Sequence, residues 1–205
     1  ATSFRFDPDN PVPTIGGNCS SYYTFEPRTE SITDYPLDKR QKLSLTKRGG
    51  WDQRIREDTL GNAPPGQPLE ERDDVVVFRT PPLTEPITIA GPLQATVVGS
   101  SDAPDTDFTA KLIDEYPPSE SFPNGFALNL ADSICRARYR GYRREPDFIT
   151  PSEVYEFDME PYPTANVFKP GHRIRLDISS SNYPRYDVNH NTGGPLYGDR
   201  EKQVA

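Results

Sequence analysis

The stretch "RIRLDIS" (173–179) alternates charged and apolar residues, and it decides the fold class. Successive side chains of an extended chain point to opposite faces, so this alternation predicts a β-strand with one apolar face. We expect the apolar residues to face a core and the charged residues to face outward. The inner residues are then Ile174, Leu176 and Ile178, and the outer residues are Arg173, Arg175 and Asp177.

Four further segments alternate in the same way. They are "LQATV" (93–97), "FTAKLI" (108–113), "ICRARYR" (134–140) and "VYEFDME" (154–160). The side chains expected on their inner faces are Leu93, Ala95, Val97, Phe108, Ala110, Leu112, Cys135, Ala137, Tyr139, Tyr155, Phe157 and Met159. A sixth segment, "VVVF" (75–78), is apolar throughout, which is typical of a strand buried on both faces.

The breaks between these segments contain Pro, Gly, Asn and Asp, which favour tight turns. No segment alternates strand and helix patterns, so we expect no parallel nucleotide-binding or hydrolase sheet in this chain. The sequence therefore predicts an all-β protein, an antiparallel β-sandwich of the jelly-roll type. We expect residues 71–205 to form the jelly-roll core and residues 1–70 to form an extended, irregular arm that covers the sandwich.

The overall composition narrows the classes of function. The chain has 205 residues, which fits one domain, and it begins Ala-Thr-Ser, so we expect a trimmed start or a piece of a longer polypeptide. Its 31 acidic and 23 basic residues give a net charge of −8, which argues against a nucleic-acid partner because phosphate binding needs a basic surface. No apolar run approaches the roughly 20 residues that cross a bilayer, so we expect no membrane partner.

The region "GHRIRLDISSSNYPRYDVNHNTG" (171–193) holds both histidines and three consecutive serines, as a Ser-His-Asp site would. A serine nucleophile usually needs a strained, exposed turn such as G-x-S-x-G, and the chain has no such motif. The serines at 179–181 follow directly on a predicted strand, so at least one should face the core. His172 opens that strand after a Pro-Gly turn, which favours a structural role, and His190 lies in a polar turn that we expect to be exposed.

No metal or cofactor site is predicted. Two histidines without CxxC or HxxxH spacing argue against zinc. The segment "SDAPDTDF" (101–108) lacks the spacing of an EF-hand, so we interpret its aspartates as turn residues that accept backbone N–H bonds. The two cysteines, Cys19 and Cys135, allow one disulfide, but their isolated positions favour free thiols, and we expect Cys135 to pack as a small apolar residue.

Two sets of residues are candidates for contact with a partner. Arg136, Arg138 and Arg140 share the outer face of the predicted strand 134–140. In an acidic chain we expect them to pair with carboxylates of this chain or of a neighbouring domain rather than to bind a free anion. The aromatic residues of the irregular arm are candidates for a ligand platform or an interface anchor, namely Tyr22, Tyr23, Phe25 and Trp51.

Several stretches, taken in order, resemble one protein family. They are "FDPDNPVPTIGG" (6–17), "ERDDVVVFRTPPL" (71–83), "GPLQATVVGSSDAPDTDFTAKLID" (91–114), "RARYR" (136–140) and "NVFKPGHRIRLDISSSNYPRYDVNHNTGG" (166–194). Together they resemble the C-terminal domain of the X-Pro dipeptidyl-peptidase, cocaine esterase and α-amino acid ester hydrolase family, also called CocE/NonD. The segment 18–70 is longer here than the family pattern leads us to expect.

This resemblance implies a galactose-binding-like jelly roll that packs on a separate α/β-hydrolase domain, which precedes it and supplies the catalytic serine, aspartate and histidine. It therefore implies that no residue of this chain is catalytic. In the esterases the loop after the Gly-Gly turn reaches the catalytic pocket, and here Tyr22, Tyr23 or Phe25 would take that place. Family members continue beyond "NTGG" with a closing strand, so we expect this jelly roll to lack its last strand.

The sequence leaves more than one class of function open. The first is the accessory β-domain of a serine hydrolase for esters or X-Pro peptides, which would also support a homo-oligomer. The second is a stand-alone carbohydrate-binding or protein-interaction module, since jelly rolls host many lectins. The third and least favoured is an independent enzyme with two catalytic carboxylates. Such a pair has no local sequence signature, so no residues are assigned to it.

Overall fold

The computed structural model describes residues 1–15, 50–54, 68–159, 163–195 and 201–205. Within these residues, irregular segments and two 3₁₀ helices join strands of 4 to 11 residues. In chain order the elements are η2 (Leu69–Glu71), β1 (Val76–Arg79), β2 (Ile87–Gly91), β3 (Ala95–Gly99), β4 (Asp107–Tyr116), β5 (Phe126–Arg136), η3 (Ala137–Tyr142), β6 (Tyr155–Met159), β7 (Thr164–Phe168) and β8 (Arg173–Ser179).

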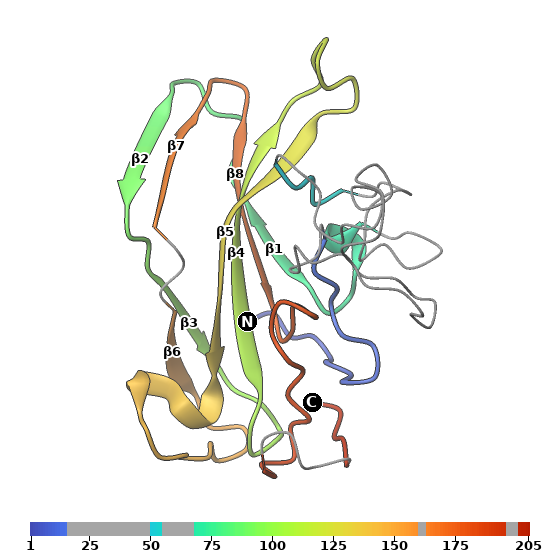
Figure 1. Cartoon of the computed structure of the whole chain (residues 1–205), viewed down its shortest axis with the longest axis vertical. Helices are drawn as coiled ribbons and strands as arrows, with labels where there is room; N and C mark the ends of the chain where they lie inside the picture. The colour runs from blue at the N-terminus through green and yellow to red at the C-terminus, as the bar shows by residue number, and fades with distance from the viewer. Residues whose placement is uncertain (16–49, 55–67, 160–162, 196–200) are drawn as a thin grey trace, which may run out of the picture.

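Four strands form an antiparallel sheet in the order β1-β8-β4-β5, which we call the main sheet. The remaining strands pair antiparallel as β2 with β7 and β3 with β6. These two pairs follow one another along one side of the main sheet (Figure 1). The prediction of an all-β, antiparallel protein is therefore confirmed.

The apolar core lies between the main sheet and the β3–β6 pair. Phe108 of β4 and Phe157 of β6 meet with their ring centroids 4.6 Å apart. The buried members of this core are Phe108, Ala110, Cys135, Ala137, Ile149, Phe157, Met159 and Ile178. Most of them occupy positions that the alternating segments predicted to be inner, because period-2 patterning places them on one face of their strands.

The opposite face of the main sheet is covered by the two ends of the described chain (Figure 1). Val12 and Ile15 pack with Leu69 of η2 and with Val75 in a second apolar cluster. Hydrogen bonds hold this cover in place, since the Val12 amide donates to Ser181 Oγ at 2.8 Å and the Thr14 amide donates to the Tyr183 carbonyl at 2.7 Å. The N- and C-terminal segments also pair with each other through Phe6 and Ala205, with N–O distances of 2.6 and 3.0 Å.

This cover explains why one prediction about β8 is wrong. Arg173, Arg175 and Asp177 were expected to face solvent, but Arg175 is 0% exposed and Asp177 is 5% exposed. Alternation in a strand shows which residues share a face, and it does not show whether other parts of the chain cover that face. The serines at 179–181, of which at least one was expected in the core, are all buried.

Three other strand predictions need correction. The segment 75–78 was expected to be buried on both faces, but β1 is an edge strand and Phe78 is 56% exposed. The segment 108–113 was expected to bury one face, but β4 is central and buries Thr109 and Lys111 as well. The segment 134–140 was expected to be one strand, but β5 ends at Arg136 and η3 follows it.

Within the part of the chain that the structure describes, no helix has the length and apolarity needed to span a bilayer.

Candidate functional site

The serines and His172 of the region 171–193 do not form a catalytic group. His172 precedes β8 and Ser179 ends it, so the two lie about 23 Å apart along the strand at 3.3 Å per residue. Ser179 Oγ donates to the Ser181 carbonyl at 3.0 Å and is 2.7 Å from Thr109 Oγ1. The Ser179 hydroxyl therefore holds the end of β8, and the Ser181 hydroxyl accepts the Val12 amide.

His172 has the structural role that the sequence indicated. Its Nδ1 lies 2.8 Å from Asp114 Oδ1, and its ring stacks at 4.3 Å on the ring of Tyr116. The other oxygen of Asp114 accepts a hydrogen bond from Asn166 Nδ2 at 3.0 Å. Since Asp114 belongs to β4 and Asn166 to β7, this buried carboxylate ties the main sheet to the β2–β7 pair.

The main candidate site is a cluster of buried ion pairs at the junction of β5 and η3. Arg136 donates from Nε and Nη2 to the two carboxylate oxygens of Asp107, each at 2.9 Å. Arg138 donates from Nε to Asp105 Oδ2 at 2.8 Å, while its backbone amide donates to Asp105 Oδ1. Asp105 is 0% exposed and Asp107 is 1% exposed, so each arginine neutralises a carboxylate that has left water.

Asn189 joins these two ion pairs into one cluster. Its Nδ2 donates to Asp105 Oδ2 at 2.7 Å and to Asp107 Oδ1 at 2.8 Å. Two buried carboxylates would repel each other, and the shared amide together with the two guanidinium groups offsets that repulsion. A cavity of about 380 Å³ adjoins the cluster and is lined by Arg136, Arg138 and Asn189, among others.

The acid–base properties of this cluster follow from its burial. Burial raises the pKa of Asp107, and the hydrogen bond and charge of Arg136 oppose that rise without cancelling it. Burial lowers the pKa of Arg136, but Asp107 outweighs burial, so the pKa of this guanidinium stands above its ordinary value. The cluster is therefore a set of buried charges that compensate one another.

Arg138 and Arg140 both lie in η3 rather than in a continued strand, so the shared strand face expected for Arg136, Arg138 and Arg140 does not form, and Arg140 has a partner of its own. Its Nη2 donates to Asp147 Oδ2 at 2.9 Å, and its guanidinium carbon lies 4.4 Å from the ring centroid of Tyr155. The structure thus places each of the three predicted arginines against an aspartate of its own chain. Their contact with a neighbouring domain stays a prediction.

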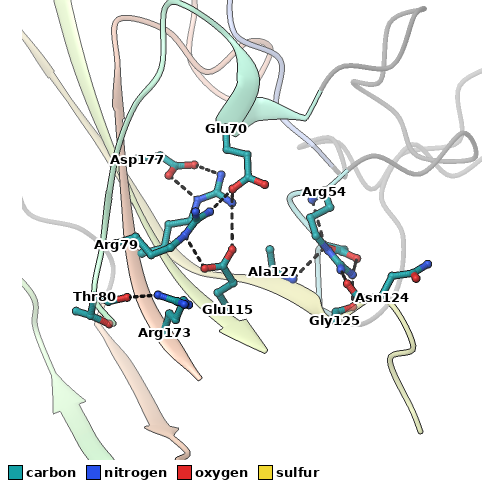
Figure 2. Close-up of polar contacts among 12 residues, drawn as sticks. Arg54, Glu70, Arg79, Thr80, Glu115, Asn124, Gly125, Ala127, Arg173 and Asp177 are labelled. Carbon is teal, nitrogen blue, oxygen red and sulfur yellow. Dashed lines mark hydrogen bonds and ion pairs between the residues drawn. The ribbon is translucent and has the colours of Figure 1, made fainter. Parts of the chain in front are cut away.

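The covered face of the main sheet carries a second charged cluster, centred on Arg175. Figure 2 labels four of its other members, Glu70, Arg79, Glu115 and Asp177. Arg175 donates to both oxygens of Asp177, at 2.7 and 2.8 Å, and to Glu70 Oε2 of η2 at 2.9 Å. Glu70 also accepts a hydrogen bond from Arg79, which pairs in turn with Glu115 at 2.7 Å. These contacts fasten η2 to the sheet.

Another arginine, Arg54, fixes the short segment 50–54 to the start of β5. Arg54 donates to the backbone carbonyls of Asn124 and Gly125, next to Ala127 in Figure 2. The same guanidinium pairs with Asp52 at 2.7 Å, and Asp52 Oδ1 accepts the Ala127 amide at 3.0 Å. An isolated antiparallel bridge between Asp52 and Leu128 places this segment beside the β5 edge of the main sheet.

The predicted aromatic platform is described only at Trp51. Tyr22, Tyr23 and Phe25 lie outside the described residues, as does Cys19. Trp51 is half-buried, and its carbonyl accepts the Asn129 amide at 3.1 Å. Cys135 is a buried free thiol, as expected. His190, expected in an exposed turn, is half-buried instead.

Sequence reasoning missed the partners of the arginines. Asp105 and Asp107 were interpreted as turn residues, and Asn189, Glu70 and Asp114 were not singled out. The available signal was the opposite charge of "DTD" (105–107) and "RAR" (136–138). Asp107 lies directly opposite Arg136 in the pairing of β4 with β5. Among the described residues, no group of three His, Cys, Asp or Glu side chains is placed to hold a metal ion.

The fold and these clusters define a class of protein, an antiparallel β-domain whose charged side chains serve to hold its own segments together. Comparison with known proteins agrees with this description. Residues 14–203 match the family described as the X-Pro dipeptidyl-peptidase C-terminal non-catalytic domain. The cocaine esterase of Rhodococcus sp. (strain MB1 Bresler) is 37% identical over 205 residues, which are 100% of this chain and 29% of the esterase.

Two solved structures extend the comparison. An aminopeptidase from the marine sediment archaeon Thaumarchaeota archaeon has a TM-score of 0.68 and 29% identity, over 94% of this chain and 27% of its own. A selenomethionine-labelled α-amino acid ester hydrolase has a TM-score of 0.70 and 27% identity, over 98% of this chain and 29% of its own. This chain belongs to the family of X-Pro dipeptidyl-peptidase C-terminal non-catalytic domains, and it spans less than a third of the length of these relatives.

Proposed function

We propose that this chain is the non-catalytic β-domain of a serine hydrolase that acts on esters or on X-Pro peptides. It packs on an α/β-hydrolase domain of the same protein and helps to wall the active site of that domain. The observation that carries this proposal is the family match over residues 14–203, combined with relatives that are more than three times longer. The pairing of His172 with Asp114, far from the serines, supports a chain without its own nucleophile.

The charged clusters suit this accessory role. A domain that walls a neighbour's pocket must hold its loops in fixed positions, since a small displacement of a contacting group costs catalytic rate. Here Arg54 fastens residues 50–54 to the start of β5, and Glu70 fastens η2 to Arg175 of β8. Trp51, the described member of the aromatic platform, is half-buried rather than presented to a glycan, which favours this role over a stand-alone lectin.

The first experiment separates an accessory domain from an independent enzyme. The 205-residue chain, incubated with p-nitrophenyl esters and with X-Pro p-nitroanilides, should give no turnover. A longer protein that carries the preceding domain should hydrolyse one of these substrates, and a serine-directed inhibitor should stop it. Turnover by the 205-residue chain that the same inhibitor abolishes would contradict the proposal.

The second experiment tests the wall of the active site. In the longer protein, Tyr22→Ala, Tyr23→Ala and Phe25→Ala should change KM or substrate preference, because these side chains would border the substrate. Tyr142→Ala is the matched control, since Tyr142 is 64% exposed on η3 and lies in no predicted platform. If all three arm variants behave like this control, the chain does not wall the pocket with these residues, while the accessory role itself is unaffected.

A further inference from the structure

The cavity beside the Arg136–Arg138 cluster has unused hydrogen-bond donors. A guanidinium group carries five N–H donors and no acceptor. Arg136 donates from Nε and Nη2 to Asp107, and Nη2 also lies 3.5 Å from the Asp187 carbonyl oxygen. Among the described residues, its Nη1 has only an ion pair at 3.5 Å with the Asp187 carboxylate. A distance of 3.5 Å is too long for a good hydrogen bond, so Asp187 binds the Nη1 group only weakly.

Arg138 contributes a second donor. Its Nε is bound by Asp105 and its Nη1 donates to the Gly194 carbonyl at 2.8 Å. In the described chain, Nη2 has no hydrogen-bond partner. The Arg138 side chain is only 7% exposed, and the cavity of about 380 Å³ borders it. Because Nη2 is not one of the fully buried atoms without a partner, water can solvate it when the cavity is empty, and a ligand oxygen there would replace that water.

The rim of the cavity adds two further nitrogen groups and one competing carboxylate. His190 and Lys202 line it, and Lys202 pairs with Asp9, whose side chain is 73% exposed. Asp187, the weak partner of Arg136, has a side chain that is 54% exposed. An exposed carboxylate at 3.5 Å is hydrated and gives up its partner at low cost.

The charges of Asp105 and Asp107 cancel those of the two arginines at long range. These carboxylates are buried and do not line the cavity, so their oxygens do not meet a ligand there. Recognition therefore rests on the direct N–H contacts of the guanidinium groups, which suit the planar oxygens of a carboxylate or phosphate. The remaining walls include Pro8, Pro11, Tyr183, Val188 and Pro195, which are apolar or aromatic.

We propose that this cavity binds a small organic anion, with a carboxylate or phosphate head on the free donors of Arg136 and Arg138 and an apolar body against the prolines and Tyr183. The head displaces Asp187 from Arg136. The site belongs to the 205-residue chain alone, and its occupancy does not depend on the function proposed above.

The test is a titration of the 205-residue chain with acetate, butanoate, hexanoate and inorganic phosphate, at constant ionic strength set with sodium chloride. Binding is followed by calorimetry and by the ¹H–¹⁵N resonances of the arginine side chains. We expect affinity to rise along the carboxylate series, by about fourfold for each methylene that becomes buried. The Nη resonances of Arg136 and Arg138 should move in step with binding, and phosphate, which has no apolar body, should move the same resonances at higher concentration.

Variants on the rim test the site without disturbing the buried ion pairs. Asp187→Asn should tighten hexanoate binding several-fold, because it removes the competing carboxylate, and Lys202→Gln should weaken it. Arg143→Gln is the matched control, because this substitution also removes one positive charge. The Arg143 side chain is 58% exposed and does not line the cavity. Two outcomes would show general attraction to charge and would overturn the proposal: an affinity that is the same for all chain lengths, or an affinity that falls equally in Arg143→Gln and Lys202→Gln. Unchanged resonances of both arginines would also overturn it.

Discussion

Arg175 and Asp177 occupy the same face of β8, two residues apart, and bind each other through two parallel hydrogen bonds of 2.7 and 2.8 Å. Arg175 is fully buried and Asp177 nearly so. Burial lowers the pKa of the Arg175 guanidinium, but the hydrogen bond and charge of Asp177 outweigh it, so the pKa is raised. The pair is the point at which η2 and the main sheet are joined, through Glu70.

Removing one member of this pair should be more harmful than removing both. Arg175→Met leaves Asp177 buried without its partner, which we expect to cost about 3–5 kcal/mol in the free energy of unfolding. The double variant Arg175→Met/Asp177→Leu should recover part of that loss, because it removes the stranded carboxylate, while the buried Lys111, which Asp177 also attracts, limits the recovery. Urea denaturation measures both, with the exposed Arg143→Gln as control. A double variant no more stable than Arg175→Met would contradict this account.

Asp114 should matter for stability rather than for chemistry. Asp114→Ala leaves His172 and Asn166 without their shared acceptor, and we expect a loss of about 1–3 kcal/mol. Glu153→Ala removes another carboxylate, but its partner Tyr155 Oη is at an exposed position, so that loss should be small. In a protein that carries the hydrolase domain, His172→Gln should leave kcat unchanged, and a fall in kcat at unchanged stability would assign His172 a catalytic role.

Cys135 should be unreactive in the folded chain. Burial, aided by the charge of Asp107, raises the pKa of its thiol from 9.0 to about 11, and the thiolate is the reactive form. In a Cys19→Ser background, a thiol reagent at pH 8 should modify Cys135 only as fast as the protein opens. Modification at the rate of a free cysteine would place this thiol at the surface.

The same shift in pKa predicts how stability depends on pH. The unfolded chain loses the Cys135 proton near pH 9, while the folded chain keeps it to about pH 11. The unfolded state therefore gains relative stability across this interval, and the free energy of unfolding should fall as the pH rises from 9 to 11. Cys135→Ala should remove the contribution of this thiol to the fall in stability. The same pH dependence of unfolding free energy in Cys135→Ala and in the unsubstituted protein would refute this prediction.

Substitution of two glycines with positive φ, Gly125 and Gly141, should distinguish the cost of backbone strain from the cost of a steric clash. Gly125 has φ +78°, and a Cβ built there lies 2.6 Å from the Tyr116 carbonyl oxygen. Gly141 has φ +65°, and a Cβ there meets nothing within 4 Å. Gly141→Ala should therefore cost roughly 1–2 kcal/mol from the left-handed backbone alone, and Gly125→Ala should cost distinctly more. Equal losses in thermal or urea unfolding would show that the contact with Tyr116 relaxes freely.

The sequence predicted the strands best where one face meets the apolar core. Phe157, Met159 and Ile178 are buried as expected, since period-2 alternation is a local property of an extended chain. Phe78 shows the limit of this reasoning, because the apolar segment 75–78 occupies an edge of the sheet, and strand order is set by pairings across more than 90 residues. Arg138 and Arg140 show another limit, since the strand ends at Arg136.

The amino-acid sequence by itself determined the all-β class, the inner faces of most strands, the absence of a nucleophile elbow and the family. Only the tertiary structure decided which charged residues are buried and with which partners they pair. Asp105 with Arg138, Asp114 with His172 and Glu70 with Arg175 are 33, 58 and 105 residues apart. A charged side chain carries the same local signal whether it faces water or an opposite charge, so its burial depends on segments that the chain brings together only on folding.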